Sequence, residues 1–227
     1  MPVIEKIPVK LNPFKVSRIL RLDLDSKENR LLLDRMIDKI SGMLAPRAYF
    51  RAAYISGKGS STIRFGGISF KSRVLRKNLD AVERAFPYVV TLGPKLEQIA
   101  GTSGDLLEQF YLEALADFAL GEARRGLELR IRKQYGVGKL SSMSPGSLED
   151  WPITEQVPLF SLLGDVETRI GVRLTDSLLM VPRKSISGML FPSETTFLSC
   201  RLCPRDRCSG RKAPFKASHR QRPNLVI

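Results

Sequence analysis

Two stretches in the last third of the chain decide the fold: residues 142–156 read SMSPGSLEDWPITEQ, and residues 170–188 read IGVRLTDSLLMVPRKSISG. The first is polar and is broken by the Pro145-Gly146 pair, which predicts a turn in a loop between two helices. In the second, short apolar runs lead into Ser185–Phe191, which alternates as a strand does. Folding alone gives no reason for such a polar loop, so we look for function here.

Helices are expected on both sides of this loop. Before it, apolar residues recur at helical spacing from Leu106 to Ile131, after a start near Asp105 and before Gly136. That helix would run for about 30 residues, or about 45 Å at 1.5 Å per residue. After the loop, Thr154 is a natural N-cap for a shorter helix.

The N-terminal half predicts a mixture of helices and strands. We expect residues 1–24 to be extended and a helix to begin at Asp25 or Ser26 and end before Pro46. The remaining expected elements are strands at 49–55, 62–65, 68–70, 88–92, 178–181 and 195–198, a helix at 75–86 and a helical turn at 95–100.

The chain is strongly basic, with 37 Lys and Arg against 23 Asp and Glu and a net charge of +14. From Arg201 onward there are eight Lys or Arg and one Asp, so half of the excess lies in that tail. A basic tail is solvated or binds a polyanion or an acidic partner. Without an aromatic-interleaved basic face or a helix-turn-helix signature, nucleic acid is the less favoured partner. No signal peptide or membrane-length apolar run is visible, which favours the cytoplasm and no membrane.

Three cysteines, Cys200, Cys203 and Cys208, lie close together in this tail. In a reducing compartment such a cluster indicates metal or redox chemistry more than a structural disulfide. The spacing resembles that of iron–sulfur ligands, with a fourth ligand from elsewhere or an open iron site. Zinc with His219 as the fourth ligand is the next candidate, and three small buried residues without metal remain the simplest interpretation.

The segment Leu174-Thr175-Asp176-Ser177, followed by Met180, Pro182, Ser185, Ser187 and Gly188, is similar to a known pattern. It resembles the Leu-Thr-Glu-Ser, Met-x-Pro and Ser-Val-Ser-Gly run of the reactivation (S-adenosylmethionine-binding) domain of cobalamin-dependent methionine synthase. Pro145-Gly146, followed by Pro152 and Glu155, resembles the Pro-Gly-Tyr loop of that family, and the chain is similar to its short, free-standing members.

The resemblance implies an α+β fold, with a twisted antiparallel sheet flanked by helices and one long central helix. It implies an activation-domain-like unit at 1–199, which leaves a basic tail with the cysteine cluster at 200–227. The residues that it suggests for binding the cofactor are Ser144, Pro145, Gly146, Ser147, Glu155, Thr175, Asp176, Ser177 and Ser187. The metal ligands that we predict are Cys200, Cys203 and Cys208.

The function implied is that of an accessory module for a methyltransferase. Such a domain presents S-adenosylmethionine to the cobalt of cobalamin on a partner, a methionine synthase or another corrinoid protein, while an electron donor such as flavodoxin or ferredoxin reduces the metal. The sulfonium methyl must be held in line with the cobalt. The cysteines could then carry an electron-delivering cluster or contact the cobalt directly. The alternatives are a corrinoid-binding adaptor without chemistry, an iron–sulfur electron-transfer activator and a nucleic-acid-binding protein.

This chain departs from the family pattern at three positions. Ser142 stands where the family usually has Arg, Ser147 where it has Tyr, and Leu190 where it often has Tyr. A guanidinium that pairs with a carboxylate cannot be replaced by a serine hydroxyl without loss.

Overall fold

The structure is a computed structural model that describes residues 3–4, 7–98, 105–208 and 210–216. Its main sheet has the strand order β1-β2-β7-β11-β8, with β3 also paired to β7, and all of these pairs are antiparallel. The strands of this sheet are β1 (Val3–Ile4), β2 (Arg47–Phe50), β3 (Ala53–Tyr54), β7 (Arg84–Thr91), β8 (Leu140–Met143) and β11 (Ser185–Pro192).

Two smaller sheets accompany it. One comprises β4 (Gly57–Lys58), β5 (Thr62–Phe65) and β6 (Ile68–Lys71), and the other β9 (Arg173–Leu174) and β10 (Met180–Val181). The helices are α1 (Pro13–Leu20), α2 (Lys27–Ser41), α3 (Arg73–Asn78), α5 (Leu106–Tyr135), α6 (Gln156–Leu163) and α7 (Val166–Ile170). Short 3₁₀ turns are η1 (Pro94–Gln98), η2 (Ile153–Glu155) and η3 (Ser199–Arg201).

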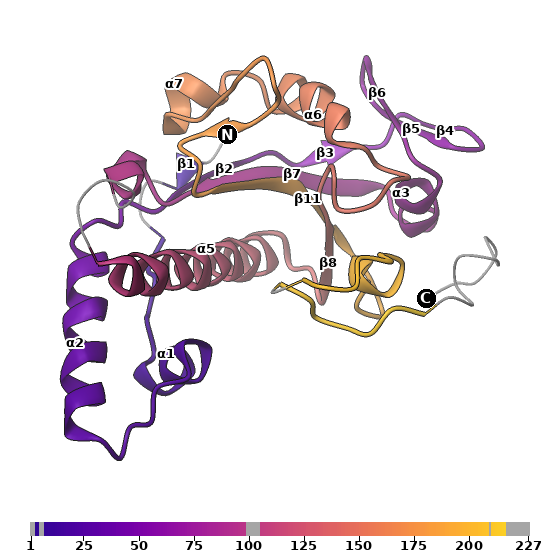
Figure 1. Cartoon of the computed structure of the whole chain (residues 1–227). Coiled ribbons are helices and arrows are strands. Elements are labelled where there is room, and N and C mark those ends of the chain that lie inside the picture. The colour runs from indigo at the N-terminus through magenta and orange to yellow at the C-terminus, as the bar shows by residue number, and fades with distance from the viewer. Residues whose placement is uncertain (1–2, 5–6, 99–104, 209, 217–227) are drawn as a thin grey trace.

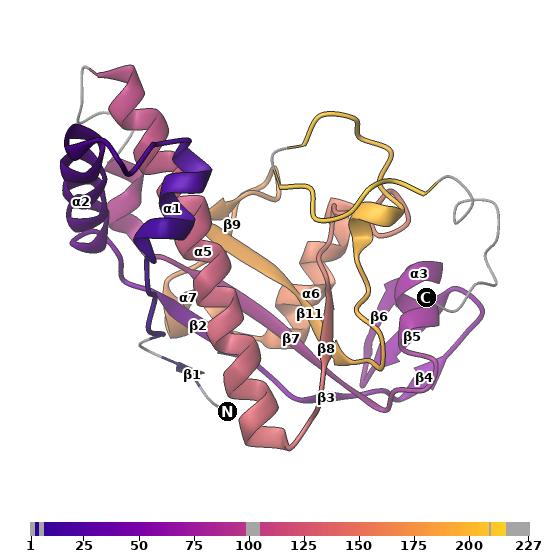
Figure 2. The ribbon, with the colours of Figure 1, turned by 90° about the horizontal axis from the view of Figure 1, so that it is seen from below.

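The main sheet lies between two helical layers (Figure 1). Helices α1, α2 and α5 cover one face, and α6 and α7 cover the other (Figures 1 and 2). Alternate residues of β7 serve the two layers, because Tyr88 and Val90 belong to the core on the α5 side while Val89 packs with α6 and α7. The predicted α+β class, with an antiparallel sheet and one long helix, is therefore confirmed.

The long helix begins and ends where its sequence signals place it. The Asp105 carboxylate accepts the backbone N–H groups of Leu107 and Glu108, and Gly136 ends the helix at a φ of +62°. Its apolar stripe is buried against the sheet and α2. A salt bridge of 2.7 Å between Lys39 Nζ and Glu108 Oε1 also joins α2 to α5. Within the described part of the chain, no helix is long and apolar enough to span a membrane.

Several predicted elements in the first half of the chain are wrong. Residues 13–20 form α1 instead of an extended segment, because Asn12 caps the helix and Pro13 opens it. The helix expected at 75–86 is only α3, and β7 already begins at Arg84. Pro87, expected to end a helix, instead lies inside β7, where its carbonyl accepts the N–H of Arg51.

Corrections are also needed near the loop. The segment at 138–144, expected to be irregular, contains β8, and the predicted strand at 195–198 does not form. The seryl hydroxyl of Ser141 instead accepts the N–H of Phe197 at 2.8 Å and so ties that irregular segment to β8. The turn expected at 95–100 is η1, and residues 99–104 lie outside the described part.

An ion-pair network holds α5 to the start of β11. Lys184, which is 7% exposed, places its ammonium 2.8 Å from Glu113 and 2.5 Å from Asp117. Arg183 pairs with Glu113 and with Glu97. Hydrogen bonding from Arg183, supported by Lys184, lowers the pKa of the Glu113 carboxyl, and the same contact raises the pKa of Arg183.

We expect this network to make the free energy of unfolding decrease at acid pH. The pKa of Glu113 is lower in the folded protein than its ordinary value of 4.5. The carboxylate of Glu113 therefore contributes fully to the free energy of unfolding above pH 4.5. The contribution is lost as the pH falls through the folded pKa. Urea unfolding between pH 7 and pH 3 should show a smaller loss of unfolding free energy for Glu113→Gln than for the wild type. An equal loss in both proteins would contradict this assignment.

Candidate functional site

The predicted loop is a compact turn closed by backbone hydrogen bonds. Gly146 N–H donates to the Trp151 carbonyl at 2.8 Å, and both the N–H and the hydroxyl of Ser147 donate to the Ser144 carbonyl. Gly146 has a φ of +79°, and a Cβ there would lie 3.0 Å from Ile153 Cδ1, so the turn requires glycine. The Trp151 side chain is fully buried and anchors the turn in the core.

Two carboxylates attach this loop to the three-stranded sheet and α3. Asp150 accepts hydrogen bonds from the Ser72 hydroxyl at 2.5 Å and from the Val74 N–H at 2.9 Å. Glu155, which the sequence suggests as a cofactor ligand, accepts the Lys71 N–H at 3.2 Å. Its carboxylate therefore helps to hold the loop in place, and the predicted cofactor role has not been tested.

The other end of the loop lies directly on β11. At Gly188, an added Cβ would lie 2.5 Å from the Met143 carbonyl, 2.8 Å from Ser144 Oγ and 3.0 Å from the Tyr88 hydroxyl. Only glycine fits this contact. Next to it, Ser187 is 4% exposed and accepts a hydrogen bond from Gln156 Nε2 at 3.2 Å. The structure thus brings the Pro-Gly loop and the Ser185–Gly188 segment together.

A buried polar cluster lies on the α5 side of this contact. The Tyr88 hydroxyl is fully buried beside Arg124 and Ser144, and among the described residues it makes no hydrogen bond of normal geometry. Burial raises the pKa of this hydroxyl, and the nearby Arg124 guanidinium opposes the shift, so the group is a neutral donor at pH 7. Arg124 Nη1 is 3.5 Å from Ser142 Oγ and 3.6 Å from Glu128 Oε2.

Sequence reasoning missed Arg124. The helix expected around it was described by its apolar stripe, and a lone arginine between Ala123 and Arg125 carries no signal in one sequence. Only the packing of α5 against β8 reveals that this guanidinium reaches Ser142, 18 residues later. It therefore brings a positive charge to the position where the family pattern usually has an arginine of its own.

Buried polar atoms without partners also occur on the opposite face of the sheet. Trp151 Nε1 and Gln156 Oε1 are buried and make no hydrogen bond among the residues that the structure describes. Buried polar atoms are normally satisfied, and an orphan can mark a missing ligand or water. Buried polar atoms without a partner among the described residues therefore lie on both sides of β11, near the loop.

The third predicted segment does not join this cluster. Thr175, Asp176 and Ser177 form a turn in which the Thr175 hydroxyl lies 3.0 Å from the Ser177 hydroxyl and accepts the Leu179 N–H at 3.1 Å. The Asp176 and Ser177 side chains are exposed. No hydrogen bond links this turn to residues 144–147, both of which are described. The structure therefore gives its polar groups local partners, and a role in binding stays a prediction.

The cysteine segment lies on the same side of the main sheet as α5 (Figures 1 and 2). Arg211 holds it together by donating to the carbonyls of Cys200, Cys203, Arg205 and Ala213. Leu202 and Cys203 pack against the core. The predicted boundary at 199 has not been tested.

The predicted metal site is not confirmed. Cys200 Sγ accepts the Lys212 N–H at 3.3 Å, and Cys208 is exposed. Among residues 7–98, 105–208 and 210–216, no group of three or more His, Cys, Asp and Glu side chains is placed to hold a metal ion. His219, the proposed fourth zinc ligand, lies outside the described residues. Metal binding by the three cysteines stays a prediction.

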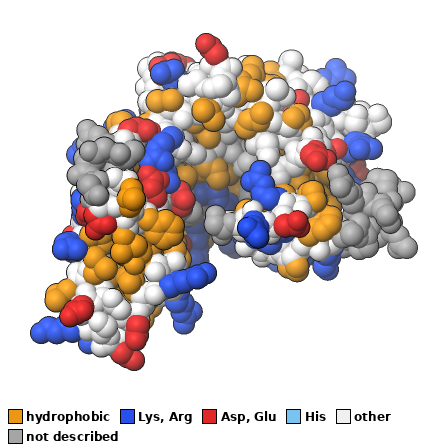
Figure 3. Space-filling view, in the orientation of Figure 1, with side chains coloured by type: hydrophobic (Ala, Val, Ile, Leu, Met, Phe, Trp, Pro, Cys, Tyr) orange, Lys and Arg blue, Asp and Glu red, His pale blue; other side chains and the backbone are white. Residues whose placement is uncertain are grey.

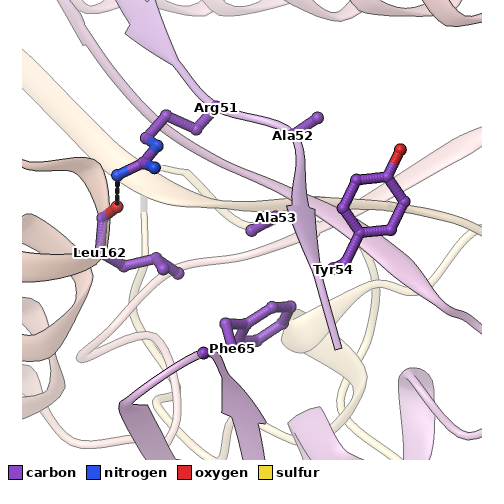
Figure 4. A pocket seen from close by; sticks show the side chains of 7 residues that line it. Arg51, Ala52, Ala53, Tyr54, Phe65 and Leu162 are labelled. Carbon is purple, nitrogen blue, oxygen red and sulfur yellow. Dashed lines mark hydrogen bonds between the residues drawn. The ribbon is translucent and has the colours of Figure 1, made fainter. Parts of the chain in front are cut away.

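A separate hollow of about 200 Å³ lies beside β3 and the end of α6. Figure 4 shows Arg51 reaching across it to donate to the Leu162 carbonyl at 2.8 Å, with Tyr54 and Phe65 nearby. The guanidinium satisfies a carbonyl at the C-terminal end of α6. None of the predicted site residues lines this hollow, and its arginine has a structural partner.

Comparison with known proteins supports the same region. The family model for the vitamin B12 dependent methionine synthase activation domain matches residues 144–210. The crystal structure of the MetH reactivation domain bound to AdoHcy has a similar fold, with a TM-score of 0.63 and 19% identity over 84% of this chain and 76% of that chain. No curated protein matches the chain. The resemblance seen in the sequence is confirmed, and over 84% of the chain it is a likeness of fold.

The close approach at Gly188 predicts that a single methyl group added at this position destabilises the fold. Gly188→Ala should lower the unfolding free energy by about 1–3 kcal/mol, since the new Cβ must push the Met143 carbonyl and Ser144 away. Chemical denaturation measures this change. Gly121→Ala is the control: nothing lies within 4 Å of its added Cβ, and in the interior of α5 it should raise stability by about 0.5–1 kcal/mol. A neutral Gly188→Ala would refute the contact.

Proposed function

We propose that this chain, with its match to the methionine synthase activation domain, is a reactivation module for a cobalamin-dependent methyltransferase, and specifically for a methionine synthase. It would bind S-adenosylmethionine and a corrinoid-carrying partner. The coarse assignment to reactivation rests on the family match and the shared fold. The ligand, the partner and the remethylation reaction are our proposal.

One observation carries this proposal. The Pro-Gly loop lies against Gly188, the buried hydroxyl of Tyr88 lies beside Ser144, and the half-buried Arg124 guanidinium lies next to both. Glycine at 188 lets the loop approach β11 closely, and the polar groups lie on strands and a helix. A ligand with a polar nucleoside end and a charged amino-acid end needs this combination of a backbone turn and fixed polar anchors.

We assign the amino-acid end of the ligand to Arg124. A carboxylate is best bound by a guanidinium, which offers two parallel N–H donors. With serine at 142, Arg124 from α5 places a guanidinium nitrogen 3.5 Å from the Ser142 hydroxyl, and its ion-pair partner Glu128 is 3.6 Å away. The AdoHcy in the similar crystal structure is consistent with a ligand of this class.

When bound, S-adenosylmethionine would supply the methyl group for the reduced cobalt of the partner's cobalamin. The chain's own contribution is to hold this ligand in one orientation at the loop and to exclude water from it. An electron donor such as flavodoxin or ferredoxin would act on the same complex. Under this proposal residues 1–199 form the binding unit, and the cysteine segment at 200–227 assists electron delivery through an iron–sulfur cluster held by its thiolates. Zinc on the same thiolates would give the segment a structural role instead, because zinc carries no electrons.

The rival function is an adaptor that binds a corrinoid protein without chemistry of its own. The self-contained Thr175–Ser177 turn and the substitutions at Ser142 and Ser147 are compatible with that function. Binding of S-adenosylmethionine separates the two, because an adaptor has no need for it.

Isothermal titration calorimetry with S-adenosylmethionine and with AdoHcy tests the ligand assignment. We expect both to bind the wild type, and Arg124→Met to weaken both by roughly 10- to 100-fold, the range expected for one charge-assisted hydrogen bond. Arg125→Met, one residue away on the exposed side of α5, should bind as the wild type does. Absence of binding to the wild type would leave the adaptor, and equal loss in both variants would exclude a specific role for Arg124.

The partner can be tested with a methionine synthase module that carries oxidised cobalamin and has no activation domain of its own. Spectroscopy should record methylcobalamin only when the chain, S-adenosylmethionine and a low-potential reductant are all present. Formation at the same rate without the chain would contradict the function. Metal and sulfide analysis of anaerobically purified protein, compared with Cys200→Ser, tests the thiolate assignment independently.

A further inference from the structure

The outward face of α2 has an open hollow lined by four residues, Glu28, Leu31, Leu32 and Arg35. Their spacing of three, four and seven places them on one side of the helix over two turns. The two leucines lie in the centre, with an acid at one end and a base at the other. The opposite face of α2 is buried in the core through Leu33, Met36 and Ile40.

On this face Leu32 is half-buried against the core, and the other three residues are exposed. Leu31 is 62% exposed, although large apolar side chains on a helix are normally directed to the core. Glu28 and Arg35 are exposed, and neither takes part in an ion pair within the described residues. They cannot pair with each other, because seven residues of helix separate them by about 10.5 Å along the axis.

We propose that this face binds the same face of a second copy of the chain, with the two α2 helices antiparallel about a two-fold axis. In that arrangement Leu31 lies against Leu32 of the other copy at the centre. Glu28 then faces Arg35 of the other copy, and by symmetry Arg35 faces Glu28. The pattern is self-complementary, which an isologous interface requires. This inference goes beyond the proposed function and does not depend on it.

The order of the charges suits a second copy because it is self-complementary, and it favours the antiparallel pair over the parallel one. A parallel pair would place Glu28 against Glu28 and Arg35 against Arg35, two like-charge contacts, whereas the antiparallel pair makes two opposite-charge contacts from the same residues. Antiparallel helices also oppose their macrodipoles favourably. Figure 3 shows further hydrophobic side chains on the lobe of α1, α2 and the start of α5, where Phe14 and Leu106 are exposed, so additional apolar area is available.

The small area of the α2 face determines how strongly the two copies are expected to associate. One helix pair is smaller than the roughly 1,200–2,000 Å² of a standard interface, so the dimer should be weak and form at micromolar concentrations. Its ion pairs are at the surface, and raising the salt concentration should therefore weaken it.

Sedimentation velocity of the full chain over about 1–200 µM, the range in which a weak interface associates, tests the dimer. We expect the wild type to shift from monomer to dimer, and Leu31→Glu to raise the dissociation constant at least about tenfold by placing a charge at the centre. Leu129→Glu, the same change at a leucine that is 53% exposed on α5, is the matched control and should leave the dissociation constant unchanged. A wild type that stays monomeric throughout overturns the proposal and leaves the face to a different partner.

Charge reversal tests the antiparallel arrangement itself. Glu28→Arg alone and Arg35→Glu alone should each lose the dimer, because each places like charges across the axis twice. When the two single variants are mixed, every contact again joins opposite charges, and a heterodimer should form. The double variant Glu28→Arg/Arg35→Glu should dimerise with itself. Dimers of the single variants, or no heterodimer in the mixture, would exclude this pairing even if the wild type associates.

Discussion

The approach of β8 to β11 at Gly188 is the constraint on which the candidate site depends. Strand β11 pairs with β7 on one side and with β8 on the other, so its backbone is fixed along most of its length. At Gly188 the Met143 carbonyl comes so close that no side chain can be present. The loop that follows β8 is thereby pressed onto the strand, and the Tyr88 hydroxyl is enclosed without a hydrogen bond. A protein that tolerates such an orphan at the centre of its sheet loses stability there, and ligand binding is a physical reason for keeping it.

Much of this arrangement could be predicted from single-sequence signals. The α5 helix was recognisable because its cap, its apolar period and its terminal glycine agree, and β11 because its alternation is regular. The Pro-Gly turn was recognisable from Pro145 and Gly146, which favour turns. Prediction failed where local signals conflicted. Pro87 predicts the end of an element, yet it lies within β7. The strand pairing of β7 on both sides stabilises it more than the missing N–H of one proline destabilises it. Asn12 and Pro13 did carry a helix signature, and the neighbouring prolines obscured it.

The polar side of the site could not be predicted, because it is assembled from distant parts of the chain. Arg124 is one of several arginines on an exposed helix flank, and nothing in its neighbourhood distinguishes it. Its proximity to Ser142 follows from how α5 crosses the sheet, which periodicity does not specify. The serine at 142 initially indicates a lost function. In the structure the Arg124 guanidinium of α5 lies 3.5 Å from the Ser142 hydroxyl, so a positive charge is present near this position although the residue itself is serine.

The same helix separates the proposed binding site from the proposed self-association surface. Glu108, at the start of α5, is joined to α2 by Lys39, and Arg124 follows 16 residues later, about 24 Å along the axis at 1.5 Å per residue. Between them, Glu113 and Asp117 fix the helix to Lys184 at the start of β11. The outward face of α2 and the loop are therefore held apart by a single helix whose position is set at three points. Two chains joined through α2 would leave both loops open, because the interface and the site are at opposite ends of this helix.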